Sequence, residues 1–197
     1  IRCKDVMCAE ELCSIKKYGY REDAMKITPE SAAKAYEELL RTARVEIMFE
    51  GCGDPTLAKD IFAQKFAGVK REPIVLSKSL VKAQRGAVKE ETERMDVKQG
   101  KLVMGFRVEG IEDYRRMNMA RITFALFGGT ANSLLFKNVR EKMSLCYYCS
   151  SGYDRSNSIM MVSSGVEAEN AQKARDEVLH QLEMLKNGEF TDRELEE

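Results

Sequence analysis

Residues 127–151 read FGGTANSLLFKNVREKMSLCYYCSS, and they carry the clearest structural signals in the chain. Gly128 and Gly129 are typical of a helix end, because glycine readily adopts the backbone conformations found there. Asn132 then begins a short helix, and the aromatic residues from Tyr147 onward favour a strand. The stretch therefore predicts a helix that ends at two glycines, a second short helix and a strand.

The rest of the chain continues this succession of helices and strands. A 3.6-residue apolar period predicts helices, and alternation with β-branched or aromatic residues predicts strands. The predicted helices span residues 30–43, 54–68, 113–126, 132–140 and 169–186, and the predicted strands span residues 45–49, 87–92, 101–108, 147–153 and 158–166. Because the strands come mostly in adjacent pairs, the predicted fold class is α+β, with an antiparallel or mixed sheet and helices on one face.

The composition excludes several classes of protein. The 197 residues include 32 Lys or Arg and 32 Asp or Glu, so the formal net charge is zero. A neutral chain has no large attraction for a polyanion, and we expect no nucleic acid as a partner. No apolar run approaches the roughly 18 residues of a spanning helix, and we expect no membrane partner. The first residues carry no secretory signal pattern, which predicts a reducing, cytoplasmic location.

The chain has two predicted parts. Residues 1–30 show no sustained period, and we expect them to form a connecting arm from a preceding domain. Residues 31–197 form the predicted α+β domain. Its last helix begins with a capping box at Thr191 and Glu194, and we expect the chain, a fragment of something longer, to cut this helix short.

A zinc site at the only histidine is the sharpest enzyme hypothesis that the residues offer. Residues 180–184 read HQLEM, one residue away from the H-x-x-E-H of inverted zinc peptidases. At 100° per residue, however, His180 points roughly 160° away from the apolar stripe of its helix. That stripe consists of Ala171, Ala174, Val178, Leu182 and Leu185. A catalytic zinc needs three protein ligands in a sheltered site, so we predict no metal here.

The cysteines and glycines offer no other cofactor site. The six cysteines lie at positions 3, 8, 13, 52, 146 and 149, and the first four show no metal-ligand spacing. In a strand, Cys146 and Cys149 would lie on opposite faces and could not share a metal unless the strand breaks. Gly128 and Gly129 lack the further glycines of a phosphate-binding loop. The sequence therefore predicts no catalytic residue, no metal ligand and no cofactor in this chain.

The stretch quoted above resembles the insulinase/pitrilysin family of zinc peptidases. That family carries a G-G-x-x-x-S-x-L-F-x-x-V-R-E-K-x-x-L-x-Y segment in the second domain of a half-molecule, and Ser144 replaces one common glycine of the pattern. Weaker similarity extends over nearly the whole chain. The matching residues are Gly128, Gly129, Ser133, Leu134 or Leu135, Phe136, Val139, Arg140, Glu141, Lys142, Leu145 and Tyr147.

The resemblance implies a fold and a role. The fold would be that of the mitochondrial-processing-peptidase and insulinase domains, paired as two halves around a chamber for an unfolded peptide. Zinc and H-x-x-E-H would belong only to the catalytic half, in the same polypeptide or in a partner subunit. This chain would be inactive alone and would grip peptide substrate through Arg140 and Tyr147, the two residues that bind substrate in the family.

Two other interpretations stay open. From the residues alone, Arg140 pairs with Glu141 or caps a helix end, and Tyr147 belongs to the core. The chain would then be a structural scaffold of the same fold, or a binding or inhibitor module. A guanidinium and a phenol hydroxyl are both hydrogen-bond donors, suited to a peptide carbonyl. Their retention favours the substrate-gripping role, because a scaffold does not need them.

Overall fold

The computed structural model describes residues 2–9, 11–75, 87–108 and 113–196. The chain divides into two compact units, one comprising residues 1–15 and 79–197 and the other residues 16–78. The predicted arm, residues 1–30, thus contributes to both units. Its origin in a preceding domain stays a prediction, as does the single domain predicted for residues 31–197.

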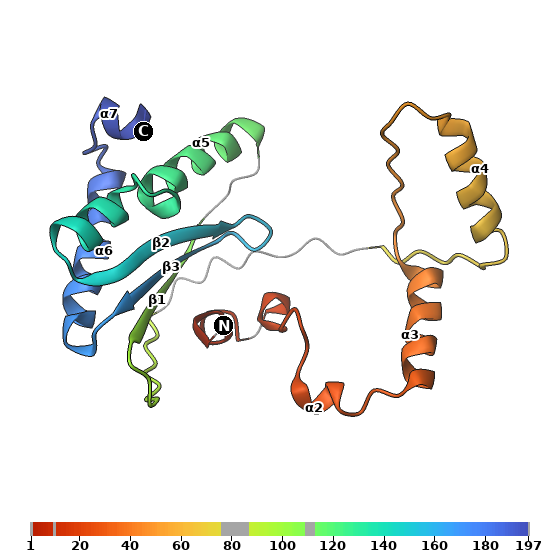
Figure 1. The fold of residues 1–197 in the computed structure, drawn as a ribbon, viewed down its shortest axis with the longest axis horizontal. Helices are drawn as coiled ribbons and strands as arrows, with labels where there is room; N and C mark the ends of the chain where they lie inside the picture. Colours follow the sequence, from red (N-terminus) through yellow and green to blue (C-terminus); the bar gives the residue numbers. More distant parts are fainter. Residues whose placement is uncertain (1, 10, 76–86, 109–112, 197) are drawn as a thin grey trace. The chain divides into compact units, whose positions relative to one another are not determined.

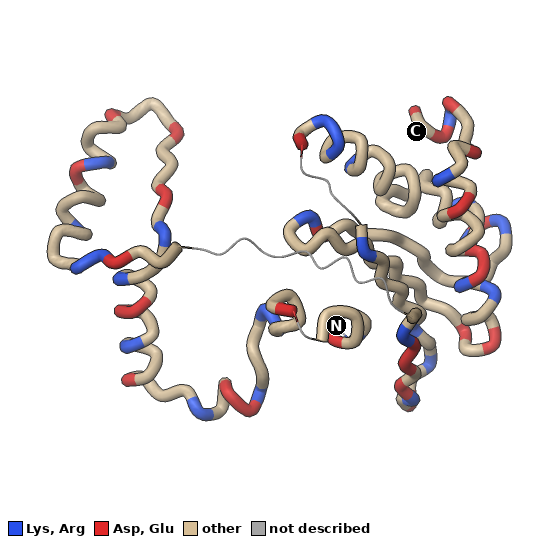
Figure 2. Tube along the Cα trace, turned by 180° about the vertical axis from the view of Figure 1, so that it is seen from behind, with Lys and Arg blue, Asp and Glu red and all other residues tan. Residues whose placement is uncertain are grey.

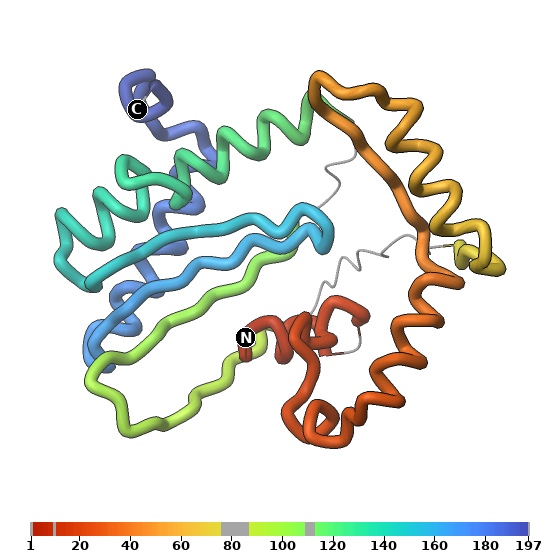
Figure 3. The backbone as a smooth tube through the Cα atoms, turned by 45° about the vertical axis from the view of Figure 1, so that its right-hand side comes forward, coloured from red at the N-terminus to blue at the C-terminus, as the bar shows by residue number. Residues whose placement is uncertain are grey.

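The larger unit is built on a three-stranded antiparallel sheet (Figure 1). Its strands are β1 (Gly100–Arg107), β2 (Cys146–Asp154) and β3 (Ile159–Val166), in the order β1-β3-β2. β2 and β3 form the predicted hairpin, and β1 pairs with the other edge of β3. Figure 3 shows β3 running between its two neighbours. The α+β class and the antiparallel pairing are confirmed.

Helices cover one face of this sheet. The helical elements are α5 (Tyr114–Phe124), the π-helical segments η2 (Ala125–Gly129) and η3 (Phe136–Lys142), the short η4 (Ala168–Asn170), α6 (Ala171–Lys186) and α7 (Asp192–Glu196). Apolar side chains from this layer meet those of the sheet in one core. Its buried members are Phe127, Leu135, Val139, Leu145, Cys149, Met160, Val162, Val166, Ala174 and Val178.

The buried face of α6 agrees with the predicted stripe. Ala174 and Val178 are fully buried, and Leu182 packs partly buried against the core. His180 is exposed, as predicted. Gln181 is buried outside the stripe, and its amide accepts a hydrogen bond from Asn138 at 3.0 Å and donates one to Glu177 at 2.8 Å. These bonds offset the loss of hydration that burying an amide entails.

Charged residues are scarce in the hairpin strands (Figure 2). β3 contains none, and β2 contains only Asp154, at its end. Most charges of the larger unit lie outside these two strands, in helices, in connecting segments and in β1, which carries Lys101 and Arg107. This distribution fits strands that are covered by protein on at least one face.

The N-terminal segment packs against the second face of the sheet (Figure 3). Its elements are α1 (Arg2–Met7) and η1 (Leu12–Ser14). A Cβ atom on Gly105 of β1 would lie 2.7 Å from Met7 Sδ, so α1 approaches the strand as closely as a glycine allows. Glu11 forms an ion pair with Arg107 of β1, and their side chains are only 8% and 11% exposed. This segment is therefore part of the larger unit and not a free arm.

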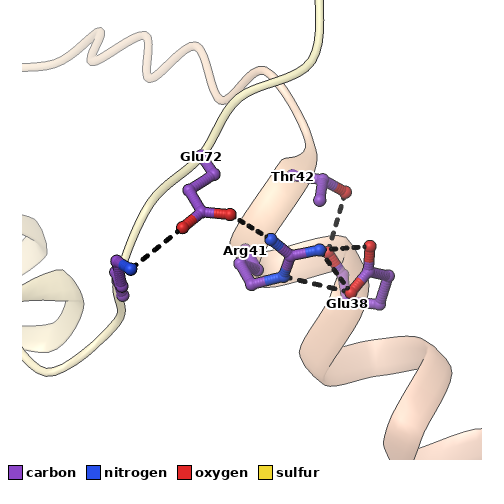
Figure 4. Close-up of polar contacts among 5 residues, drawn as sticks. Glu38, Arg41, Thr42 and Glu72 are labelled. Carbon is purple, nitrogen blue, oxygen red and sulfur yellow. Dashed lines mark hydrogen bonds and ion pairs between the residues drawn. The ribbon is translucent and has the colours of Figure 1, made fainter.

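The smaller unit contains α2 (Arg21–Ala24), α3 (Pro29–Thr42) and α4 (Pro55–Phe66). Thr28 caps α3: its hydroxyl accepts a hydrogen bond from the Ser31 backbone N–H, and the Ser31 side chain accepts one from the Thr28 N–H. At the other end of α3, Arg41 contacts both Glu38 and Glu72 (Figure 4). The Glu72 N–H also donates to the Arg41 carbonyl at 2.9 Å, which holds residues near 72 beside the last turn of α3.

Two predicted strands are absent from the described structure. Residues 45–49 are not paired in a sheet; their alternating side chains Val45, Ile47 and Phe49 line a hollow of about 440 Å³ together with Phe62 and other residues of α4 and its surroundings. These alternating apolar side chains face the helix α4 and not a neighbouring strand. Residues 87–92 are likewise unpaired and largely exposed. A period-two pattern predicts an extended backbone, but a strand also needs a partner.

The glycine pair at 128 and 129 lies within a helical segment and does not break it. α5 passes directly into η2, which ends only after Gly129. A Cβ atom on Gly128 would lie 2.6 Å from Ser151 Oγ and 2.8 Å from a methyl of Leu135. Close packing of η2 on β2 therefore requires glycine at this position, whereas we predicted a helix end and a turn.

In the described part of the chain, no helix combines the length and apolar composition needed to cross a membrane.

Because one face of α6 is buried and the other is exposed, replacing a side chain by alanine should change the stability differently on the two faces. Leu182→Ala should lower the free energy of unfolding by about 2 kcal/mol, near the lower end for large-to-small core changes because Leu182 is only partly buried. His180→Ala, two residues away and exposed, should change it by less than about 0.5 kcal/mol. Urea denaturation of both variants measures the difference, and the reverse order would overturn the orientation of α6.

Candidate functional site

Arg140 lies in the last turn of η3 and is exposed. Its guanidinium sits over the ring of Phe136, one turn earlier, at 4.5 Å from the ring centroid. A cation over an aromatic face gains about 0.5–1 kcal/mol at an exposed site. The contact orients the arginine without consuming its N–H donors, which stay available to another molecule.

Tyr147 lies at an irregularity in β2. Cys146 pairs with Val166 and Tyr148 with Gly165, so Tyr147 is the extra residue of a β-bulge. Its side chain is 61% exposed, and its hydroxyl donates a hydrogen bond to Glu167 at 3.3 Å. Bulges commonly redirect a side chain next to a functional site. The bulge explains why this tyrosine, which the residues alone would place in the core, lies at the surface.

Arg140 and Tyr147 lie close together in the sequence, but their side chains contact different residues. Arg140 contacts Phe136, and Tyr147 contacts Glu167. In the described residues, no hydrogen bond joins the two side chains. The alternative pairing of Arg140 with Glu141 is also absent from the described contacts. Both side chains are exposed polar groups next to the end of η3 and the start of β2. Their joint action on a substrate stays a prediction.

The turn between the two residues is held in an unusual conformation. Ser144 has a φ of +51°, in the left-handed region that favours glycine. The Leu145 N–H donates to the Val139 carbonyl at 3.1 Å and closes this turn. The resembling pattern has glycine where this chain has Ser144, and the backbone angle supplies the physical reason for that preference.

The bulge at Tyr147 overturns one prediction about the cysteines. Cys146 faces Val166 and Cys149 faces Ser164, two residues along β3, so both cysteines lie on the same face of the sheet. Burial, followed by the neighbouring Cys146, raises the pKa of the Cys149 thiol to about 12. A thiol in this state is inert as a nucleophile at neutral pH. The bulge interrupts the regular alternation of β2, which is the condition under which Cys146 and Cys149 could share a metal. In the described residues, however, no third metal-ligand side chain lies with this pair.

A second cluster, which the spacing did not predict, forms in the N-terminal segment. Potential ligand atoms of Cys8, Glu11 and Cys13 all lie within 4.8 Å of one another. Cys8 is fully buried and the other two are partly buried. Cys8 and Cys13 thus lie together although their spacing in the sequence is not that of metal ligands. A C-x-x-E-x-C pattern is visible in the sequence, but it does not reveal the fold that brings its side chains together. The Glu11 N–H donates to the Cys8 carbonyl at 2.8 Å, and the Ser14 N–H donates to the Glu11 carbonyl at 2.9 Å.

The chemistry of the exposed site is limited to hydrogen-bond donation. The sequence contains a single histidine, and the structure leaves it exposed on α6. The N–H groups of Arg140 can donate to a carbonyl oxygen or an anion, and the Tyr147 hydroxyl can do so in exchange for its bond to Glu167. Neither group generates a nucleophile from water. The described residues therefore show an α+β domain that presents two hydrogen-bond donors, Arg140 and Tyr147, at its surface.

Comparison with known proteins agrees with this class. Residues 26–197 match the family described as the peptidase M16 inactive domain, and the chain belongs to that family. This confirms the resemblance to the insulinase/pitrilysin peptidases and their inactive domain type. It also supports the absence of a catalytic metal from this chain.

The chain is similar to proteins that are about twice its length. It is 27% identical over 195 residues to the probable inactive metalloprotease YmfF of Bacillus subtilis (strain 168), covering 99% of this chain and 46% of that protein. A conserved protein from Enterococcus faecalis V583 has a TM-score of 0.86 at 25% identity, over 99% of this chain and 46% of that one. The peptidase M16 inactive domain from Pseudomonas fluorescens has a TM-score of 0.76 at 22% identity, over 99% and 47%. The chain thus spans about half the length of these relatives.

The backbone at Ser144 predicts a stabilising substitution. Ser144→Gly should raise the free energy of unfolding by about 0.5–1 kcal/mol, because relief of the left-handed strain exceeds the greater freedom of glycine in the unfolded chain. Ser150→Gly, at an exposed position inside β2, is the matched control and should lower it by a similar amount. Denaturant midpoints measure both, and a loss of stability in Ser144→Gly would contradict the strain.

Proposed function

We propose that this chain is the non-catalytic half of a two-part peptidase and grips an extended peptide through Arg140 and Tyr147. The guanidinium and the phenol hydroxyl would donate to carbonyl oxygens of the peptide or to charge developing on them during hydrolysis. The observation that carries this proposal is the exposure of both donors on either side of a strained turn, one on η3 and one at a β-bulge.

The proposal requires a catalytic half that this chain does not contain. With one histidine, the chain cannot carry H-x-x-E-H, so zinc and the general base would belong to another half. The length of the relatives supports a second half of similar size in the same polypeptide. A partner subunit would serve equally. A reducing, cytoplasmic location belongs to the same proposal and is supported by cysteines that are all free in the structure.

A scaffold role is the second candidate. The B. subtilis relative is named as a probable inactive metalloprotease, and this name covers a protein about twice as long as this chain. If the parent protein had no catalytic half, this domain would keep the fold of the family and the protein would cleave no peptide. Binding of an unfolded peptide distinguishes a gripping domain from a pure scaffold even when nothing is cleaved.

The functional prediction concerns Arg140 and Tyr147 in the complex of this chain with its catalytic half. Arg140→Ala should lower peptide turnover by about 2–4 kcal/mol of transition-state stabilisation, the magnitude expected for one well-placed donor. Tyr147→Phe should give a smaller loss, because only the hydroxyl is removed. Thermal unfolding of both variants should differ little from that of the unchanged chain.

Two neighbouring residues of α5 provide matched controls. Arg115→Ala and Tyr114→Phe remove the same groups from exposed positions, and they should leave turnover unchanged. Fluorescence anisotropy with a labelled, unfolded peptide gives a readout that does not depend on cleavage. Unchanged turnover and unchanged peptide binding in a folded Arg140→Ala complex would favour the scaffold.

A further inference from the structure

The cluster of Cys8, Glu11 and Cys13 combines ligand types that bind thiophilic divalent metals. Cysteine sulfur and carboxylate oxygen are both common zinc ligands, at about 2.3 Å and 2.0–2.2 Å from the metal. Two sulfurs bound to one tetrahedral zinc lie about 3.8 Å apart. The ligand atoms here already lie within 4.8 Å of one another, so about 1 Å of closure would complete the set.

The two oxygens of Glu11 face different partners. Oε2 lies 3.8 Å from Cys13 Sγ and accepts from Arg107 Nη1 at 3.0 Å, whereas Oε1 accepts from Arg107 Nη2. A metal placed between the sulfurs would take Oε2 and displace only Nη1. The bond between Oε1 and Nη2 would persist and orient the carboxylate, as hydrogen-bonded partners of metal ligands commonly do.

The charges of the cluster also suit a divalent cation. Two thiolates, one carboxylate and a divalent metal together carry one negative charge, and the guanidinium of Arg107 neutralises it. Arg107 Nη2 already lies 3.8 Å from Cys8 Sγ, so its positive charge is next to a thiolate there. Its second anchor is the Met7 carbonyl, at 2.9 Å, which keeps the guanidinium in place without the metal.

We propose that Cys8, Glu11 and Cys13 bind one zinc ion, with water at the fourth position, and that this ion fixes the N-terminal segment against β1. The site is distinct from peptide hydrolysis: its ligands come from a sequence-local turn, and it lies on the face of the sheet opposite the helical layer. Arg107 is a positioning residue that connects this turn to the strand. The consequence is a larger unit whose N-terminal segment is more firmly held when zinc is present.

The test uses the full chain, reduced with a phosphine, stripped of metal with EDTA and titrated with cobalt(II) sulfate and then zinc sulfate. We expect one cobalt ion per chain with thiolate-to-cobalt charge-transfer absorption, and displacement of that signal by zinc. Cys13→Ser should weaken binding at least about a hundredfold, and Glu11→Gln about ten- to a hundredfold. Zinc should raise the midpoint of thermal unfolding of the unchanged chain but not that of Cys13→Ser.

The controls separate this site from other ligands. Cys3→Ser, on the same segment but outside the cluster, and His180→Ala should both bind cobalt as the unchanged chain does. Cys8→Ser should abolish the signal; because Cys8 is fully buried and its replacement can unfold the segment, the partly buried Cys13 decides the case. The proposal fails if the reduced chain shows no thiolate-to-cobalt absorption, if Cys13→Ser retains it, or if Cys3→Ser or His180→Ala loses it.

Discussion

The fold of the larger unit depends on the central strand β3, which pairs with β1 on one edge and with β2 on the other. β3 is uncharged and almost wholly buried, and its inward residues Met160, Val162 and Val166 form the floor on which the helical layer packs. A three-stranded sheet with one apolar face is about the smallest that is stable when helices cover it. Because the central strand meets neighbours on both edges, its register fixes where each residue of β1 and β2 can lie.

The register of β2 then determines the surface that carries Tyr147. A Cβ atom on Gly165 would lie 2.5 Å from the Tyr148 ring, so the ring of Tyr148 occupies the space above this glycine. Tyr148 is thereby paired with Gly165, while Cys146 remains paired with Val166, and one residue must be left over. That residue is Tyr147, which the bulge directs to the surface. The same extra residue brings Cys146 to the face that Cys149 occupies.

Local sequence signals predicted those elements that depend on neighbouring residues only. The helix predicted over residues 30–43, the adjacent strands over residues 147–153 and 158–166 and the buried stripe of α6 follow from spacing along a few turns, and the structure contains all three. Failures occurred where a distant partner decides the outcome. Residues 45–49 have the alternating apolar and polar residues of a strand, but their apolar side chains face the helix α4 and not another strand. The bulge depends on Gly165, eighteen residues after Tyr147, and the Cys8 cluster depends on how one turn folds against Arg107. The periodicity of apolar residues over a short stretch of sequence does not reveal such contacts with distant residues.

In the proposed role, the chemistry of the exposed donors explains why the domain would need a partner to contribute to hydrolysis. The guanidinium of Arg140 and the phenol hydroxyl of Tyr147 are both hydrogen-bond donors, so both favour negative charge on a bound oxygen. Neither accepts a proton from water, and the buried Cys149 is held as a thiol by burial. Attack on a peptide therefore requires a base or metal from elsewhere, whereas charge that develops after the attack needs only fixed donors. A domain can lose its own catalytic groups and still contribute to the second requirement, provided that its donors stay at the surface and its core does not depend on them. The exposure of Arg140 and Tyr147 meets that condition.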